Sequence, residues 1–269
     1  MRRVPGPREL TAECDGLRFL LDLGDDVQRS IYFECYEPSD VALLTPLIPP
    51  GGVCLDAGAN VGFYTLHFAR RVGPEGRVHA FEPDPRNAAR LRANCALNGF
   101  GPIVEVREAA ISDREGTASL HRSEAAHSGW GSLAPGGGAE SVTEVETTTL
   151  DAYLARMRLD RVDLLKADVE GSECALLLGA RESLRSRRIR RLFIEFNGVR
   201  LREQGKGLED FLRPLEEAGY APAASHAGLV DRMRSGEIPP HTVWPNLLFE
   251  PAGGAGGSDG GLDSTKGSP

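Results

Sequence analysis

The chain has 269 residues, of which 41% are apolar, and its formal net charge is −8 at pH 7. This length and composition suit one large α/β core, and two full domains are not expected. The acidic balance leaves no dense basic patch for a phosphate backbone, so we expect no nucleic-acid partner.

The expected cellular setting follows from the cysteines and the apolar runs. Five cysteines are scattered without CxxC spacing, which indicates reduced, mostly buried thiols and not a disulfide framework. No apolar run approaches ~18 residues, and the first residues lack the apolar segment of a signal peptide. We therefore expect a cytoplasmic protein without a membrane partner.

Three segments are expected along the chain. Residues 1–15 are expected to be flexible, residues 16–251 to form a single domain, and residues 252–269 to be a disordered Gly/Ser-rich tail. The domain is expected to begin with a small β extension, a hairpin of strands at 17–23 and 31–35. A helix is expected at 40–47, before the Pro/Gly stop at 49–52.

The most informative pattern lies at 53–97. A short apolar strand ends in Asp56, a turn with Gly58 and Gly62 follows, and an amphipathic helix begins at once. A second strand at 77–81 ends in Glu82, and a second helix is expected at about 85–97. Rossmann-type folds hold a nucleoside with this succession of strand, glycine turn, helix and second strand, followed by an acidic residue. Glu82 is then placed to accept hydrogen bonds from two ribose hydroxyls.

The residues of the turn indicate which nucleoside is bound. A nicotinamide cofactor carries a pyrophosphate and usually binds a GxGxxG turn with an uncharged entry. Here Asp56 brings a negative charge to that position, which repels pyrophosphate but suits a ligand with an ammonium and a sulfonium. We therefore predict a site for S-adenosylmethionine (SAM).

Further strands complete the expected sheet. A third strand at 103–106 leads to small residues around Ala110, which either leave room for an adenine ring or simply pack. Strands are expected at 117–121 and 142–147, and the Gly/Ser-rich segment 121–141 between them is either a mobile lid or disordered. A helix is expected at 150–157, another at 208–218, a strand at 220–223, a polar loop at 226–241 and a last strand at 243–250.

Polar side chains gather where the fourth and fifth strands end. Lys166, Asp168 and Glu170 alternate at period two, and the fifth strand ends in Glu195 and Asn197. Because ligands of open α/β sheets sit beyond the carboxyl ends of the strands, we expect these groups to share a site. Charges buried at such a place are costly unless they pair or serve that site.

Together these segments resemble the FkbM family of SAM-dependent methyltransferases. The motifs that carry the resemblance are LDAGANVGFYT at 55–65, AFEPD at 80–84, TLDAY at 149–153, DLLKADVEGSE at 163–173, LGA at 178–180 and NLLF at 246–249. The resemblance implies a Rossmann-like class I methyltransferase fold: a seven-stranded, mostly parallel sheet in the order 3-2-1-4-5-7-6, with helices on both faces. It also implies methylation of a hydroxyl on a sugar, polyketide or other secondary metabolite.

Site roles follow from position. We expect Asp56, Gly58 and Asn60 to hold the amino-acid end of SAM, Glu82 the ribose and Ala110 the adenine. Asp168 is expected to bind the cofactor as well and is the first candidate for the base that takes the proton of the acceptor hydroxyl, and Glu170 is the second.

The same strand ends also allow a metal-assisted form of the methyl transfer. Asp168, Glu195 and Asn197 offer three oxygen ligands of the kind Mg²⁺ prefers, and the ion would lower the pKa of the acceptor hydroxyl.

Two other functions agree less well with the sequence. An NAD-dependent oxidoreductase is disfavoured by Asp56 and by the missing third glycine of the turn. A catalytically inactive SAM-binding protein is disfavoured by the presence of Asp168 and Glu170.

Overall fold

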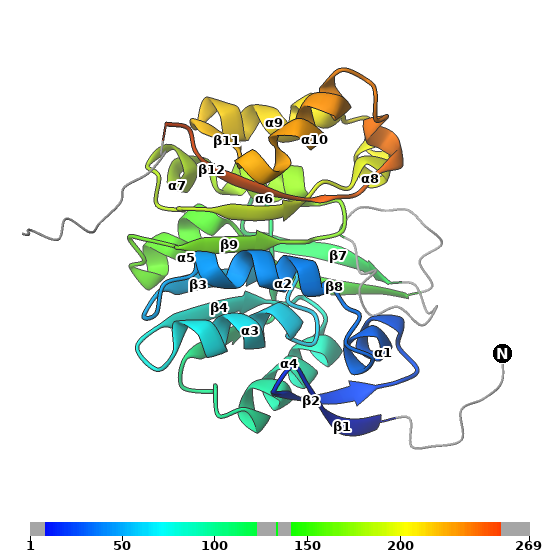
Figure 1. The fold of residues 1–269 in the computed structure, drawn as a ribbon, viewed down its shortest axis with the longest axis vertical. Helices are drawn as coiled ribbons and strands as arrows, with labels where there is room; N and C mark the ends of the chain where they lie inside the picture. Colours follow the sequence, from blue (N-terminus) through cyan, green and yellow to red (C-terminus); the bar gives the residue numbers. More distant parts are fainter. Residues whose placement is uncertain (1–8, 123–132, 134–140, 254–269) are drawn as a thin grey trace, which may run out of the picture.

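The computed structural model describes residues 9–122, 133 and 141–253. A seven-stranded sheet runs through the middle of the molecule, with helices on both of its faces (Figure 1). Its strands are β3 (Val53–Ala57), β4 (Arg77–Phe81), β5 (Val104–Arg107), β9 (Leu164–Ala167), β10 (Leu192–Glu195), β11 (Tyr220–Pro222) and β12 (Asn246–Pro251).

The strands lie in the order β11-β12-β10-β9-β3-β4-β5. β3 is central and pairs in parallel with β4 on one side and β9 on the other. β5 and β10 extend the parallel part, whereas β12 runs antiparallel to both β10 and β11. A Rossmann-like α/β fold with a mixed seven-stranded sheet is thereby confirmed. The carboxyl ends of the parallel strands meet at one edge, where such sheets bind ligands.

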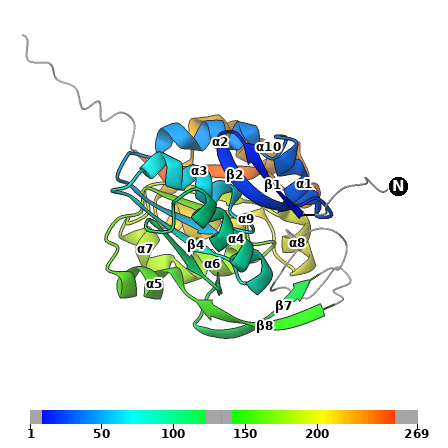
Figure 2. The same ribbon diagram turned by 90° about the horizontal axis from the view of Figure 1, so that it is seen from below.

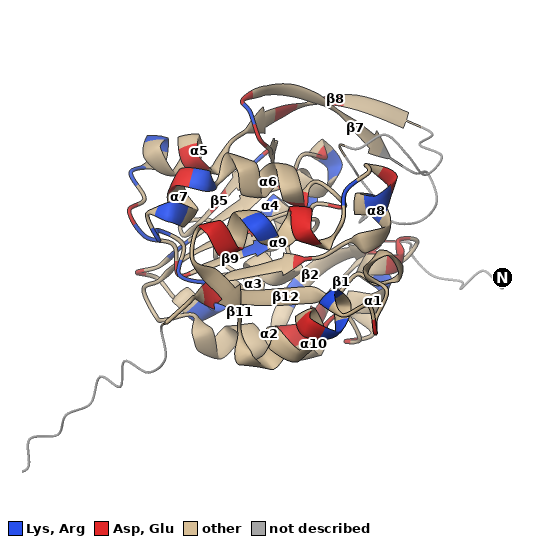
Figure 3. Ribbon diagram, turned by 90° about the horizontal axis from the view of Figure 1, so that it is seen from above, with Lys and Arg blue, Asp and Glu red and all other residues tan. Residues whose placement is uncertain are grey.

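Helices follow most of the strands and cover the sheet. They are α1 (Asp26–Tyr32), α2 (Pro38–Leu44), α3 (Phe63–Val72), α4 (Pro85–Leu97), α5 (Leu150–Met157), α6 (Glu173–Gly179), α7 (Arg181–Arg185), α8 (Gly198–Glu203), α9 (Leu208–Glu217) and α10 (Ala224–Arg234), with short 3₁₀ turns at η1 (Thr45–Leu47) and η2 (Pro240–Thr242). Acidic and basic side chains are interspersed along α7 and α9 (Figure 3), as expected of solvated helix faces.

Alternating strand residues build a core on each face of the sheet. In β3, Cys54 packs with Phe68 of α3, whereas its neighbour Leu55 belongs to the opposite core, with Leu177 of α6 and Phe211 of α9. The alternation follows from the two-residue period of a strand. Since full burial of one Leu or Phe side chain contributes roughly 1.5–3 kcal/mol, this packing holds the helices to the sheet.

The N-terminal extension differs from the expected hairpin. β1 (Glu9–Cys14) pairs with β2 (Leu17–Asp22), so strand structure begins within the segment expected to be flexible. The prediction of a strand at 31–35 was wrong, because residues 26–32 form α1. The helix begins at Asp25, whose side chain accepts a hydrogen bond from the backbone N–H of Gln28 and caps it.

A second correction concerns 226–241, which was expected to be a polar loop. Residues 224–234 form α10, and only Val230 and Met233 of this helix are buried. These two side chains are three residues apart and therefore lie on one face, which is enough to dock a mostly polar helix on the sheet.

A separate three-stranded sheet stands beside the main one. It consists of β6 (Ala109–Ile111), β7 (Gly116–Arg122) and β8 (Ser141–Thr148), in the order β6-β8-β7. Figure 2 shows β7 and β8 on the side of the molecule away from α2 and α10. Most of the expected 121–141 loop and of the 252–269 tail lies outside the described residues. Within the described ranges, none of the helices has the length and apolar character needed to cross a membrane.

Candidate active site

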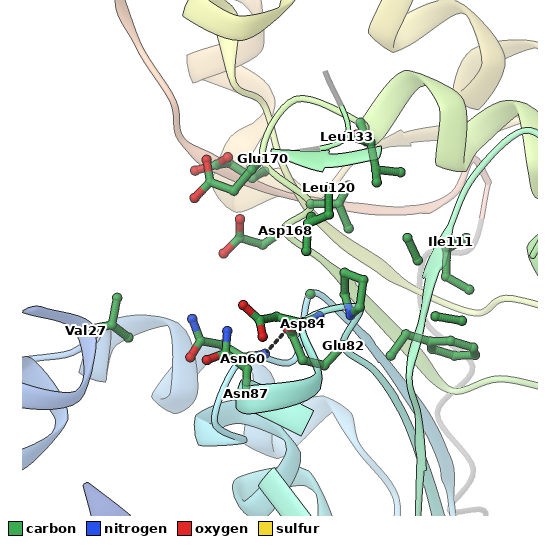
Figure 4. A pocket seen from close by; sticks show the side chains of 18 of the residues that line it. Val27, Asn60, Glu82, Asp84, Asn87, Ile111, Leu120, Leu133, Asp168 and Glu170 are labelled. Atoms are coloured by element: carbon green, nitrogen blue, oxygen red, sulfur yellow. Dashed lines mark hydrogen bonds between the residues drawn. The ribbon is translucent and has the colours of Figure 1, made fainter. Parts of the chain in front are cut away.

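A cavity of about 270 Å³ lies at the carboxyl edge of the parallel strands (Figure 4). This is near the lower end of the usual range for small-molecule sites, roughly 300–1,000 Å³. Most of the residues proposed from sequence line it, namely Gly58, Asn60, Glu82, Ala110, Asp168, Glu170 and Glu195. Asp56 and Asn197 are not among its lining residues.

The turn after β3 brings two strand ends into close contact. Gly58 has φ +78°, and a Cβ placed there would overlap the carbonyl oxygen of Asp168. The backbone N–H groups of Gly58 and Ala59 both donate to the carbonyl of Phe81, each at 3.0 Å. Only glycine fits this turn, because both the left-handed backbone and the close approach exclude a side chain.

Glu82, directly after β4, is held in place by the backbone. Its Oε2 accepts the N–H of Asn60 at 2.8 Å, and its Oε1 accepts the N–H of Asp84 at 2.9 Å. Burial raises the pKa of Glu82 to about 7, although the two backbone donors oppose this shift. The carboxylate is therefore fixed at the cavity wall, where it can accept further hydroxyl donors.

The wall beside Glu82 is apolar. It is formed by β6, where Ala109, Ala110 and Ile111 are all buried and line the cavity. Small side chains beside a fixed carboxylate suit a flat base attached to a sugar.

Asp56 lies beneath the cavity. Its side chain is fully buried, its Oδ2 accepts a hydrogen bond from the Thr65 hydroxyl at 2.6 Å, and its Oδ1 lies 3.8 Å from Lys166 Nζ. Burial raises the pKa of Asp56, opposed by Lys166 and Thr65. The carboxylate therefore has Thr65 and Lys166 as its partners and does not line the cavity, and its contact with a cofactor stays a prediction.

Lys166 links the two strand ends from below. Its ammonium donates to the Gly58 carbonyl and to Asp168 Oδ2, each at 3.4 Å, and lies 5.0 Å from the centre of the Tyr64 ring. Burial alone would lower its pKa, but the carboxylates of Asp168 and Asp56 hold the pKa above its ordinary value. Lys166 is thus a permanent buried cation that orients Asp168.

Asp168 and Glu170 face the cavity from the loop after β9. Figure 4 shows them across from Asn60, Glu82 and Asp84. Burial raises the pKa of Glu170 to about 8, and the negative charges of Asp168 and Glu173 add to this shift. Burial, then Asp168 and Glu170, raises that of Glu195 to about 10.

Glu173 braces this loop. Its Oε1 accepts the backbone N–H groups of Val169 at 3.2 Å and Gly171 at 3.1 Å, and its side chain is fully buried. Burial raises its pKa to about 7, opposed by these backbone donors. Glu173 therefore fixes the loop that carries Asp168 and Glu170.

The geometry does not favour the magnesium site. The side-chain oxygen of Asn197 accepts the Arg200 N–H at 3.2 Å and caps α8, and its amide donates to Glu195 Oε2 at 3.2 Å. Among the residues with described positions, no group of three His, Cys, Asp or Glu side chains could hold a metal ion.

Several residues that line the cavity were not predicted from the sequence, among them Tyr36, Glu37 and Trp244. Tyr36 and Glu37 enter from the segment before α2, and the Tyr64 hydroxyl donates to Glu37 Oε2 at 2.6 Å. Trp244, 61% exposed, enters from the segment before β12. No local motif marks these residues, although Trp244 lies two positions before the NLLF motif.

Comparisons with known proteins point to one family. The family model described as "Methyltransferase FkbM domain" matches residues 56–222. The 2-O-methyltransferase NoeI of Sinorhizobium fredii is 32% identical over 181 residues, which span 60% of this chain and 70% of that relative. The 31-O-demethyl-FK506 methyltransferase FkbM of Streptomyces tacrolimicus is 33% identical over 178 residues, 56% of this chain and 67% of that relative.

Among solved structures, the fold is similar to that of the methyltransferase FkbM from Methylobacillus flagellatus KT. The two share 15% sequence identity at a TM-score of 0.45, and the match covers 84% of this chain and 55% of that one.

Proposed function

The chain belongs to the FkbM methyltransferase family, and from this premise we propose that it transfers the methyl group of SAM to a hydroxyl of a small organic acceptor. The observation that carries the proposal is one cavity lined both by Glu82, suited to a ribose, and by Asp168, suited to a proton acceptor. Two relatives, NoeI and FkbM, are named for methylation at an oxygen, which supports oxygen as the methylated atom.

The cavity residues fit SAM. Gly58 leaves a cradle that a Cβ would fill, and Glu82 supplies a fixed carboxylate for the ribose hydroxyls. Ala109 and Ala110 would line the adenine, and Asn60 would lie near the amino-acid end. When bound, SAM supplies a methyl group on a positively charged sulfur.

The protein's own part is positioning and proton transfer. Lys166 donates to Asp168 Oδ2, which leaves Oδ1 for the acceptor hydroxyl. With SAM bound, Asp168 would take the proton of the acceptor hydroxyl as that oxygen receives the methyl group from the sulfonium, which would leave as S-adenosylhomocysteine. Glu173 keeps the Asp168 loop in place throughout, through its bonds to Val169 and Gly171.

The test combines cofactor titration with methyl transfer. We expect wild type to bind SAM and S-adenosylhomocysteine (SAH) with micromolar affinity, and Glu82→Gln to weaken both by about tenfold, the size of one lost charge-assisted hydrogen bond. Glu182→Gln is the matched control, because this carboxylate is 75% exposed on α7, outside the cavity lining.

Asp168→Asn separates binding from chemistry. It should keep its SAH affinity within about threefold while transfer of labelled methyl to cyclohexanol-type acceptors falls roughly 10²–10⁴-fold, the usual contribution of a general base. A folded wild type that binds neither SAM nor SAH would refute the proposal. Binding without transfer to any acceptor would identify an inactive SAM-binding protein instead.

A further inference from the structure

The far end of the cavity, away from Glu82, is acidic. Glu37, Asp168, Glu170 and Glu195 line it, and the described lining residues include no Lys, Arg or His. Asp168 has its cation in Lys166 below. Glu195 accepts from the Asn197 amide, and the described residues form no ion pair with it. This end of the cavity is therefore rich in carboxyl groups, and Arg200 acts on one of them, Glu170.

Glu195 lies away from the residues that would hold SAM. The cofactor residues belong to the ends of β3 and β4 and to β6, whereas Glu195 ends β10, two strands from β3 in the sheet. Since neighbouring strands are about 4.8 Å apart, Glu195 lies roughly 10 Å across the sheet from the glycine turn. The sulfonium and ammonium of SAM are thus not the evident partners of Glu195.

An aromatic side chain stands at the same end. Glu195 pairs in register with Asn246, and the Phe196 N–H donates to the Pro245 carbonyl at 2.9 Å, so the segment carrying Trp244 runs beside the end of β10. Trp244 lines the cavity, yet most of its surface is exposed. An indole beside carboxylates is the combination that attracts an organic ammonium, by cation–π and charge-assisted hydrogen bonding.

We propose that the acceptor is an amino alcohol, whose protonated amine binds between Trp244 and Glu195 while its hydroxyl lies at Asp168. The inference rests on the proposed function, because it names the substrate of the same site. An ammonium has no lone pair, so the incoming methyl forms its bond to the hydroxyl oxygen. The hydroxyl proton passes to Asp168, SAH leaves, and the amine keeps its proton.

Proton release is expected on binding. Burial, followed by the neighbouring carboxylates of Asp168 and Glu170, raises the pKa of Glu195 to about 10 in the free site, which favours its protonated form. An ammonium beside it favours the charged form, so the bound amine displaces that proton.

Three ring compounds test the proposal, because they differ only in the group opposite the hydroxyl. They are trans-4-aminocyclohexanol (cationic), cyclohexane-1,4-diol (neutral) and 4-hydroxycyclohexanecarboxylate (anionic). Their dissociation constants are measured by ligand-observed NMR at pH 7.5, on protein saturated with SAH. We expect the amine to bind about tenfold more tightly than the diol, the size of one charge-assisted contact, and the carboxylate to bind most weakly.

Variants assign the preference to its residues. In Glu195→Gln, the ratio of amine to diol should fall to within about twofold, and Trp244→Ala should weaken the amine more than the diol. Glu182→Gln should keep the wild-type ratio, because its carboxylate is remote from the cavity. Thermal unfolding of each variant confirms that it is folded.

Four outcomes would each overturn the inference. They are equal binding of the three rings, a preference for the diol or the carboxylate, no binding of any ring, and an unchanged ratio of amine to diol affinity in Glu195→Gln. A titration of SAH, carried out first, shows whether the protein binds the cofactor product at all, and so separates failure of the amino-alcohol inference from failure of the proposed function. A protein that binds SAH but shows no amine preference remains a SAM-dependent enzyme with a different acceptor.

Discussion

The pH dependence of cofactor affinity follows from the environment of Glu82. The folded protein raises the pKa of this buried carboxyl from 4.5 to about 7. At about 1.4 kcal/mol per pH unit, the difference corresponds to roughly 3 kcal/mol that favours the protonated form in the free protein. Because the folded pKa is the higher one, this contribution to stability is complete below pH 4.5 and is lost as the pH rises through 7.

Cofactor binding should reverse the preference. Ribose hydroxyls donate to the carboxylate and so favour its charged form, which means that binding below pH 7 must release a proton from Glu82. Affinity for SAH should then fall by up to about tenfold for each pH unit between 7 and 5. Glu82→Gln has no proton to release, so its weaker affinity should change little over this range.

Calorimetric titration of SAH at pH 5, 6, 7 and 8 measures the slope. Repeating the pH 6 titration in two buffers of different ionisation enthalpy counts the released protons, and we expect nearly one. Glu182→Gln should behave as wild type, since its side chain is exposed on α7. A flat wild-type affinity from pH 5 to 7, or an equal slope in Glu82→Gln, would refute the reasoning.

Three further substitutions test the parts of the site that act from below. Gly58→Ala should destabilise the protein by more than about 2 kcal/mol in urea unfolding, because left-handed backbone costs roughly 1–2 kcal/mol and the new Cβ overlaps the Asp168 carbonyl; wild-type stability would contradict this. Lys166→Met should cost about 3–5 kcal/mol by leaving buried carboxylates uncompensated, and the added change Asp56→Asn should recover part of the loss. Glu173→Ala should lower the unfolding free energy by about 1–3 kcal/mol, because two backbone N–H groups lose their acceptor. It should also slow methyl transfer more than it weakens SAH binding. Unchanged transfer would show that Glu173 does not position the loop that carries Asp168.

The central unit was predictable because its signals are local. The strand at 53–55, the glycines and the capped helix at 85–97 each carry their own pattern, and β3, β4 and α4 follow it closely. The helix at 150–157 is likewise marked by Thr149, whose hydroxyl accepts the Ala152 N–H. Where α10 forms, only Val230 and Met233 are fully buried and Leu229 is partly buried against the core, so the helix depends on docking and leaves almost no periodic signal.

The site was predictable where strand ends carry polar residues, and not where distant segments close it. Glu82, Asp168 and Glu170 line the cavity because parallel strands end at one edge. Glu37 and Trp244 come from segments before α2 and β12, and only the folded chain brings them to that edge. Asp56 does not line the cavity, because a strand-end acid can point below the edge as well as beyond it; Thr65, nine residues on, donates to it there.

Because Gly58 contacts Asp168, the glycine turn after β3 and the loop after β9 should respond together to mutation. The Gly58 carbonyl and the Asp168 side chain share one donor, Lys166, and no side chain fits between the two backbones. A shift of either loop therefore moves the other, because the packed interior does not deform continuously. In the proposed reaction, Lys166 would therefore help to set the distance between the donor methyl and Asp168, and in-line transfer is sensitive to displacements of about 1 Å. This makes Lys166 a determinant of rate as well as stability, although it lies outside the cavity lining.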